Sequence, residues 1–459
     1  MQRDERFPDY ADAVCILGVK GLDSSQALHW VGRQRDLYLL DDSDAHIPFD
    51  LLGHPRVHFW KIETPLMHDQ IVKEIAWHAA MRSLSIHCQP EWEKLGKRLD
   101  ECHHAAHLLL SETADFGKQA ISNARINWRT NGPFRNWASL HRCFQNVPAI
   151  VCGAGPSLAK ASHHLKELSS RGIIFAAGTA ESILGEWGVE PHLSFFFDKE
   201  SPIDLILRQT CGEIPACLQS RLNPQFARWL HGEKILAPES GPLPWEKWWM
   251  DSDANPSFGW TVGNFATQTA VWMGCNPIIW IGMDFCYQEG QKYAGKQNQN
   301  QAPLIECRGR KTQRDWLLAA RWSEELASEH PDIRFVNTSM EGLPLHLPIE
   351  TMPLCEAQRL LNEQFDLQGR LHQALQLGGW VAMANREEEW AHSWESCAFL
   401  SSDPTADVDE ALAQEAVYEF YLEPLWQIWR PIFEREAQGQ NLAWHRLLFF
   451  QQVLQNEPV

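Results

Sequence analysis

Short runs of apolar residues alternate with amphipathic segments through the middle of the chain. The apolar runs between residues 149 and 282 read AIVC, GIIFAA, LSFFF, ACLQ, KILA and PIIWIG. Runs that are apolar at nearly every position are typical of strands buried on both faces, and the segments between them have helical spacing. This pattern predicts a parallel α/β sheet covered by helices on both faces.

The first ninety residues show the same alternation on a smaller scale. Strand-like runs read AVCIL, DLYLL and RVHFW, and they predict a small βαβ-type unit. Gly18 and Gly21 follow the first run, at the place of a dinucleotide-binding fingerprint, but the third glycine and the helix opening of that fingerprint are missing. Turn glycines are the simpler interpretation, and ligand binding is the alternative.

Helical spacing dominates the two remaining stretches of the sequence. It runs from about residue 91 to 137 and again beyond Pro353, where Gly378-Gly379 and the loop SSDPTAD interrupt it. We therefore expect four segments. They are a small α/β N-terminal domain (1–90), a helical connector (91–144), a nucleotide-binding domain (145–352) and a helical C-terminal domain (353–459).

Charge and composition narrow the partners and the compartment. The formal net charge is -19, which opposes binding to a nucleic acid or an anionic membrane surface. The chain starts with MQRDERFPDYAD and contains no run of about eighteen apolar residues, so we expect a cytoplasmic protein with neither a signal peptide nor a membrane span. The 12 cysteines include no CxxC pair, which is typical of free, buried thiols.

Two residue types suggest chemistry but have a plainer explanation. The 22 tryptophans include Trp390, Trp394 and Trp426 on helical patterns, where packing in a core is a better interpretation than sugar stacking. His103 and His107 share a helix face at a spacing that suits a metal. No carboxylate or cysteine of matching spacing accompanies them, so we expect no metal site there.

The clearest candidate for chemistry is the turn that follows the AIVC run. Its residues are Gly153, Ala154, Gly155, Pro156 and Ser157, and an amphipathic helix follows. The glycines allow the backbone to approach a ligand, Pro156 suits the first turn of a helix, and Ser157 offers a hydroxyl. Free N–H groups and the dipole at a helix start favour a phosphate. The turn lacks the lysine of a P-loop, and a purely structural strand-to-helix turn is the alternative.

Polar or backbone-exposing residues follow the neighbouring predicted strands. Gly178 and Thr179 follow one strand, and Asp198 and Asp284 follow two others. The carboxyl ends of parallel strands meet at one edge of a sheet, and ligands bind beyond that edge. These residues and the glycine turn therefore predict one nucleotide site, although a single strand-end aspartate is more often a cap.

Two further segments complete the predicted site. The run SFGWTVGNFATQT contains a second helix start, with Gly263 and Asn264. The polar loop CYQEGQKYAGK holds Tyr287 and Tyr293. Tyrosine hydroxyls at the mouth of a parallel sheet can donate hydrogen bonds to a phosphate oxygen as it takes up charge. Packing of the loop is the alternative for both rings.

Four features between Pro148 and Pro348 form a recognisable set: GAGPSL, the spacing of Gly188, Pro191 and Asp198, the segment WMGCNPIIWIGMDF, and NTSMEGLPLHL. The set resembles the motility accessory factor proteins, which share a domain with the archaeal 6-hydroxymethylpterin diphosphokinase and are described as MptE-like. The segments TVGNFATQTAVWMG and IGMDFCYQEGQKYAG are also similar to bacterial sialyltransferases that use CMP-activated sugars. The resemblance implies a Rossmann-like, sialyltransferase-like parallel sheet.

This resemblance assigns roles to several residues. Tyr287 and Tyr293 match the two catalytic tyrosines that hold the departing phosphate of the sialyltransferases. The residues that match nucleotide-contacting turns are Gly155, Pro156, Ser157 and Gly263.

The sequence also departs from the sialyltransferases. Three asparagines of those enzymes align with Ala154, Gly178 and Asp198, and the acidic Asp198 agrees better with the motility accessory factors. The catalytic histidine aligns near Arg310. Arginine is a poor general base because it keeps its proton, so the acceptor base stays unassigned.

The resemblance and the motifs together predict a glycosyltransferase. We expect it to move a nonulosonic (sialic-acid-like) sugar from a CMP-activated donor to a hydroxyl of a glycan or a protein, with flagellin as one candidate, and to need no cofactor. The main alternative is a diphosphokinase in which Asp198 and Asp284 hold Mg²⁺ across the phosphates of ATP while a pterin alcohol attacks. A third alternative is a nucleotide-binding scaffold without activity.

Overall fold

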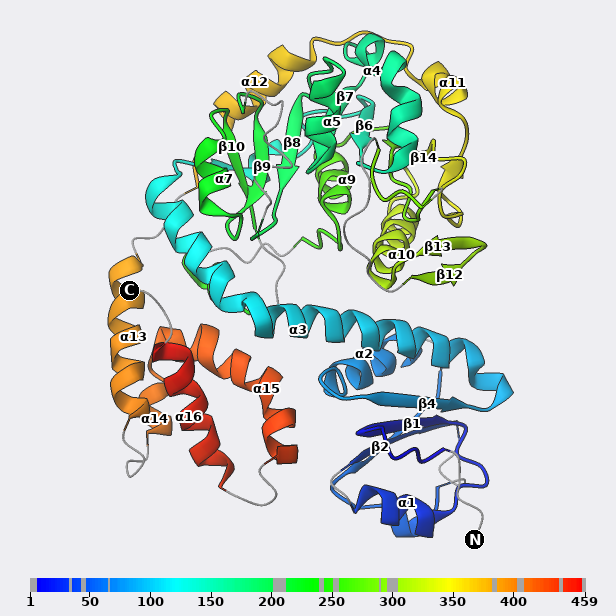
Figure 1. Ribbon diagram of the computed structural model, residues 1–459, viewed down its shortest axis with the longest axis vertical. Coiled ribbons are helices and arrows are strands. Elements are labelled where there is room, and N and C mark those ends of the chain that lie inside the picture. Colours follow the sequence, from blue (N-terminus) through cyan, green and yellow to red (C-terminus); the bar gives the residue numbers. More distant parts are fainter. Residues whose placement is uncertain are drawn as a thin grey trace. The chain divides into compact units, whose positions relative to one another are not determined.

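The computed structural model describes most of the chain, and Figure 1 shows its elements. The described residues are 6–32, 35–42, 47–64, 67–200, 212–238, 243–250, 256–288, 290–294, 304–381, 386–402, 408–436 and 441–455. The chain forms two compact units. One contains Met1–Gly117, Gly241–Trp245 and Asn385–Val459, and the other contains Lys118–Ser240 and Glu246–Ala384.

A nine-stranded sheet organises the second unit. Its spatial order is β15-β14-β11-β6-β7-β8-β9-β10-β5, and all its strand pairs are parallel. The strands are β5 (Arg135–Asn136), β6 (Ala149–Cys152), β7 (Ile173–Ala177), β8 (Leu193–Phe196), β9 (Ala216–Gln219), β10 (Lys234–Ala237), β11 (Ile278–Ile281), β14 (Phe335–Asn337) and β15 (Glu350–Thr351). The six apolar runs of the sequence are therefore six of these strands, as predicted.

Successive residues of the central strands pack into two different cores. In β6, Ala149 and Val151 belong to one apolar cluster, which also contains residues of helix α9 (Val262–Trp272). Ile150 and Cys152 belong to a second cluster, which contains residues of helix α4 (Ser162–Leu168). Both faces of the sheet are therefore covered, which explains why its strands are apolar at nearly every position.

The chain reverses its direction across this sheet at β6. Strands β7 to β10 follow β6 on one side, whereas β11 and β14 lie on the other side. Loops that leave two neighbouring strands in opposite directions open a crevice at the carboxyl edge of the sheet. The topology thus places a crevice between the turns that follow β6 and β11.

Helices and one hairpin complete this unit. The α-helices not yet named are α5 (Ala180–Glu186), α7 (Pro224–Trp229), α8 (Trp245–Met250), α10 (Arg314–Glu329), α11 (Leu354–Ala357) and α12 (Leu367–Leu377), and the hairpin pairs β12 (Ile305–Cys307) with β13 (Arg310–Thr312). Helix α3 (Glu93–Thr130) supplies residues to both units. It lies in the stretch for which the sequence predicts a helical connector.

The first unit contains a smaller parallel sheet of order β3-β2-β1-β4. Its strands are β1 (Ala13–Leu17), β2 (Asp36–Asp41), β3 (Val57–Lys61) and β4 (Leu84–Cys88), and its helices include α1 (Ser24–Val31) and α2 (His68–His78). Strands β2 and β3 lie on one side of β1 and β4 lies on the other. The predicted N-terminal α/β unit is confirmed, and its strand order also reverses, between β1 and β4.

The C-terminal part of the first unit is helical, as predicted. Its helices are α13 (Glu387–Ser401), α14 (Asp409–Leu412), α15 (Glu423–Glu436) and α16 (Leu442–Gln455). Trp390, Trp394 and Trp426 are buried there, which confirms that these tryptophans pack in a core. The predicted break SSDPTAD falls largely outside the described residues, since 403–407 are not among them.

The two histidines that suit a metal have partners of another kind. A ring nitrogen of His103 lies 3.0 Å from the carbonyl oxygen of Ala79, and one of His107 lies 2.8 Å from that of Ala80. Burial lowers the pKa of His103. These histidines therefore cap the carbonyl end of α2. Separately, no helix among the described residues has the length and apolar character needed to cross a bilayer.

Candidate functional site

A cavity of about 440 Å³ lies at the carboxyl ends of β6, β7, β8 and β11. Nine of the residues predicted from the sequence line it: Gly153, Ala154, Gly155, Gly178, Thr179, Asp198, Gly263, Asp284 and Tyr293. Four others, Pro156, Ser157, Asn264 and Tyr287, are outside its lining. The structure therefore brings most of the predicted site together in one place.

The glycine turn after β6 packs directly against the turn after β11. The N–H of Gly153 donates to the carbonyl of Ile281 (2.8 Å), and the N–H of Gly155 donates to that of Gly282 (2.9 Å). A Cβ atom at Gly153 would lie 2.5 Å from the Gly282 oxygen, and one at Gly155 would lie 2.5 Å from a carboxylate oxygen of Asp284. Both glycines are thus required by the close approach of two turns of the protein itself.

Asp284 occupies the helix start for which the sequence predicts a phosphate. Its carboxylate is buried and accepts hydrogen bonds from the N–H of Ser157 (2.9 Å), from the Ser157 hydroxyl and from the Ser339 hydroxyl. A carboxylate stabilises the positive end of a helix in the same way as a phosphate. A ligand phosphate over residues 153–158 therefore has to displace this contact or lie beside it.

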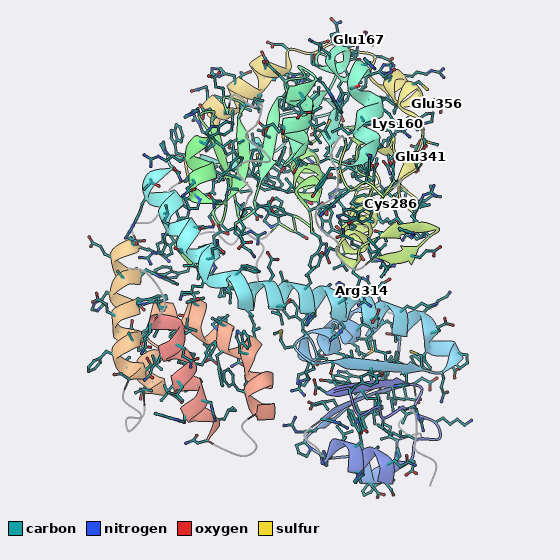
Figure 2. All side chains as sticks on the ribbon, viewed as in Figure 1. Lys160, Glu167, Cys286, Arg314, Glu341 and Glu356 are labelled. Carbon is teal, nitrogen blue, oxygen red and sulfur yellow. The ribbon has the colours of Figure 1, made fainter. Side chains whose placement is uncertain are left out.

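The helix after the turn begins as a 3₁₀ segment, Pro156–Ala161, and becomes α4 at Ser162. Pro156 has no N–H, and the N–H of Leu158 donates to the carbonyl of Gly155 at 3.0 Å. Lys160 on this segment forms an exposed 2.7 Å ion pair with Glu341, which follows β14 (Figure 2). The predicted amphipathic helix is present, with its first turn tightened at the proline.

Helix α9 presents its N-terminus to the cavity. Its cap is a reciprocal box in which the N–H of Asn264 donates to the Thr261 hydroxyl, and the Asn264 side-chain oxygen accepts from the N–H of Thr261, both at 3.2 Å. The Asn264 amide also donates to the Ser323 hydroxyl (2.9 Å). Asn264 is fully buried, so it builds the helix start, while Gly263 and Thr261 face the cavity.

The ends of β7 and β8 form another part of the wall. Gly178 has a positive φ of 53°, and its N–H donates to the carbonyl of Phe195 at 3.0 Å. Thr179 is the residue before α5. Asp198 is exposed, and its backbone carbonyl accepts the N–H of Asn223 at 3.2 Å. These residues join two strand ends at the cavity, as the parallel sheet predicts.

The two tyrosines have different positions. Tyr293 lines the cavity beside Lys292, whose ammonium nitrogen lies 5.2 Å from the centre of the Tyr293 ring and 5.7 Å from that of Trp316. Tyr287 stands behind the wall, because its hydroxyl accepts a hydrogen bond from the Gln313 amide and its ring centre lies 5.0 Å from that of Trp316. Gln313 and Trp316 both line the cavity. Tyr287 thus supports two wall residues.

Sequence reasoning missed several residues of the wall, including Lys292, Trp260, Gln313, Asp315 and Trp316. Lys292 directly precedes Tyr293, and Trp260 lies three residues before Gly263, so both are sequence neighbours of predicted site residues. The sequence analysis interprets the tryptophans as core residues, and this interpretation misses Trp260 and Trp316. Gln313, Asp315 and Trp316 lie at the start of α10, and no local motif marks them.

Two reactive groups near the cavity are excluded as nucleophile or base. Burial and the nearby Asp284 carboxylate raise the pKa of the Cys286 thiol to about 11 (Figure 2), so this cysteine stays protonated at neutral pH. The catalytic histidine of the sialyltransferases aligns near Arg310, and Arg310 donates from its Nε to the carbonyl of Gly342 at 3.3 Å. It is outside the lining of the cavity.

The comparisons with known proteins agree with this architecture. Residues 122–290 match the family model described as 6-hydroxymethylpterin diphosphokinase MptE-like, which agrees with the resemblance to that family. No curated protein matches the chain.

Among solved structures, the MAf glycosyltransferase from Magnetospirillum magneticum AMB-1 is similar. The TM-score is 0.63 and the identity 14%, over 97% of this chain and 78% of that chain. At this identity the likeness shows a shared fold. The α/β fold class with a parallel central sheet, a small N-terminal α/β unit and C-terminal helices is confirmed.

Proposed function

We propose that this chain is a glycosyltransferase that moves a nonulosonic (sialic-acid-like) sugar from a CMP-activated donor to a hydroxyl of a protein or glycan. The observation that carries the proposal is the meeting of Lys292 and Tyr293 with the α9 N-terminus and four strand ends in one cavity. The fold shared with a MAf glycosyltransferase supports it. Flagellin is one candidate for the protein acceptor.

The donor phosphate lies between the Lys292 ammonium and the start of α9. These groups supply positive charge and N–H donors, whereas the buried Asp284 carboxylate repels an anion placed directly on the first helix start. The Gly153–Gly155 backbone then forms the floor of the site. Trp260 and Trp316 add aromatic surface to the wall, which suits a nucleoside and a sugar ring.

Catalysis depends on charge that collects on the departing phosphate. Tyr293 and Lys292 line the same cavity, and donors aimed at a developing charge lower the barrier more than they strengthen the resting complex. Tyr287 acts indirectly, because its hydroxyl holds Gln313 and its ring packs on Trp316. It is a positioning residue in this proposal.

The acceptor base is Asp315. The cavity wall contains three carboxylates, Asp198, Asp284 and Asp315. Asp284 already accepts three hydrogen bonds within the protein, and Asp198 aligns with a donor-contacting asparagine in the sialyltransferase resemblance. Asp315 is exposed at the first turn of α10, next to Trp316, where it can take the proton of an entering hydroxyl.

A magnesium-dependent diphosphokinase is the second candidate, since the matching family model carries that description. It requires Asp198 and Asp284 to hold Mg²⁺ across the phosphates of ATP. The three hydrogen bonds to Asp284 engage both of its carboxylate oxygens, so this arrangement has to give up internal contacts before the metal is bound. A donor phosphate beside Lys292 and Tyr293 leaves the hydrogen bonds to Asp284 in place.

A thermal-shift panel separates the two reactions. A ligand that binds only the folded protein raises the unfolding midpoint by mass action, so CMP without a metal should raise it. A shift with ATP and Mg²⁺ but none with cytidine nucleotides would establish the diphosphokinase in its place. If neither nucleotide acts at saturating concentration, both reactions are contradicted.

A further inference from the structure

A cavity of the first unit lies at the carboxyl edge of the four-stranded sheet. Its volume is about 830 Å³, larger than that of the candidate catalytic cavity. Its wall combines the residues after all four strands with the first turns of α2 and α3. The position is the reversal point of the strand order, between β1 and β4, where α/β sheets bind their ligands.

The glycine that follows β1 does not cradle a phosphate. Gly18 has a positive φ of 84°, and a Cβ atom there would lie 2.8 Å from the side chain of Gln89 and 2.9 Å from the Trp92 ring. These two side chains cover the backbone that a dinucleotide fingerprint would expose to a pyrophosphate. Gly18 is therefore a turn glycine, and the cavity beside it serves another kind of ligand.

Part of the polar wall is used within the protein. Asp41 is buried and accepts the N–H of Val19 at 2.6 Å, and the guanidinium of Arg98 lies 3.6 Å from the Asp69 carboxylate. Asp42 and Glu91 are exposed to solvent. Among the described residues, neither side chain has a hydrogen bond or an ion pair.

The polar groups of the wall indicate the ligand class. The charged side chains that line the cavity are Asp41, Asp42, Glu63, Asp69, Glu91, Lys20, Lys94 and Arg98. Ionised carboxylates only accept hydrogen bonds, so they suit a ligand rich in hydroxyl donors. Trp92 adds an aromatic surface and Gln89 an amide, and Lys20 and Lys94 can pair with an acidic group of the ligand.

We propose that this cavity binds a saccharide, either neutral or carrying a single carboxylate. Asp42 and Glu91 accept hydrogen bonds from its hydroxyls, and Trp92 packs against its ring. The site lies wholly within the first unit and does not depend on the donor cavity of the second unit. It gives the chain a means of holding a glycan in addition to any sugar it transfers.

The test is ligand-observed saturation-transfer NMR on the full chain, which detects millimolar binding. The probes are galactose, N-acetylglucosamine and N-acetylneuraminic acid, each with CMP added to fill the donor cavity. At least one should give a signal with CMP present. The double variant Asp42→Asn/Glu91→Gln should weaken that binding by roughly tenfold or more, because two charge-assisted hydrogen bonds are lost.

Glu74→Gln is the matched control, since Glu74 is exposed on α2 and outside the cavity wall; it should bind like the unmodified chain. The proposal is overturned if no probe binds, if CMP displaces the probe, or if the double variant binds as tightly as the control. A chain that binds a saccharide but no CMP would contradict the proposed glycosyltransferase and leave this site standing. Failure of the saccharide site and failure of the proposed glycosyltransferase therefore give different results.

Discussion

Both parallel sheets of this chain reverse their strand order beside a cavity, but the two cavities differ in their walls. In the nine-stranded sheet, the turn at Gly155 packs on Asp284, and Lys292 and Tyr293 supply a cation and a hydroxyl. In the four-stranded sheet, the turn at Gly18 packs under the neutral side chains of Gln89 and Trp92, and five carboxylates and three cationic side chains line the wall. One topology therefore provides two cavities whose walls offer different polar groups.

This difference separates what a fold determines from what its side chains determine. Strand order places a crevice at the carboxyl edge of each sheet. Whether that crevice favours a phosphate or a polyol depends on the groups that line it, because a phosphate needs donors and positive charge whereas hydroxyls also need acceptors. The cavity of the four-stranded sheet lies where α/β folds bind nucleotides, but its wall does not offer the groups of a phosphate site.

The largest effect expected from this comparison concerns the acceptor base. Asp315→Asn should lower the rate of sugar transfer by roughly a thousandfold, the scale of general-base catalysis, with little change in CMP affinity. Asp198→Ala, which removes the side chain at the position of a donor-contacting asparagine, should instead weaken donor binding. The measurement is steady-state transfer from a CMP-activated nonulosonate, with CMP affinity from titration.

The exposed Asp332, outside the cavity wall, gives a matched control, and Asp332→Asn should behave as the unmodified chain. A normal transfer rate in folded Asp315→Asn protein would remove this residue from the mechanism. An equal loss in transfer and in CMP affinity would move it to the donor site.

The two tyrosines should differ in the next largest effect. Tyr293→Phe removes the hydroxyl of a residue that lines the cavity, and we expect the transfer rate to fall by roughly a hundredfold while donor affinity changes little. Tyr287→Phe removes only the acceptor of the Gln313 amide, so its rate should fall by less than about tenfold. The measurement is the rate of donor hydrolysis and of transfer in both variants. A larger loss of rate in Tyr287→Phe than in Tyr293→Phe would mean that Tyr287 stabilises the departing phosphate.

Much of the fold was accessible from the sequence because its signals are local. Six apolar runs mark six strands, and the glycine turn marks the carboxyl edge. The contact between Ser157 and Asp284 spans 127 residues, so no local pattern could reveal that a carboxylate fills the helix start. Asn264 illustrates the same limit, since a glycine-bearing helix start does not show whether its asparagine faces a ligand or closes a capping box.

A change in stability tests the packing of the turn after β6 against the turn after β11. Gly155→Ala places a Cβ atom 2.7 Å from the carbonyl oxygen of Gly282 and 2.5 Å from Asp284, and we expect it to lower the free energy of unfolding by about 3 kcal/mol. Gly379→Ala is the control, because no atom lies within 4 Å of its added Cβ. Denaturant unfolding of both variants provides the measurement. Equal stability of the two would show that the turn is open to a ligand.

The smallest effect concerns Glu181, a buried carboxyl in the first turn of α5. Burial raises the pKa of this carboxyl to about 7. The unfolded chain has the ordinary, lower pKa, so between the two values the folded protein binds more protons than the unfolded chain, and stability falls as the pH rises. From about pH 5 to about pH 7 the loss should be about 2 kcal/mol.

Glu181→Gln keeps the shape of the side chain and removes its titration, so the variant should lose this part of the pH dependence and be the more stable protein at about pH 7. The measurement is urea unfolding at several pH values, with Glu74→Gln as the exposed control. Parallel stability curves for Glu181→Gln and the unmodified chain would mean that the Glu181 carboxyl is ionised in the fold. The ionised Glu181 would then add a buried negative charge beside the Gly178 turn, whose carbonyl accepts the Glu181 N–H at 3.0 Å.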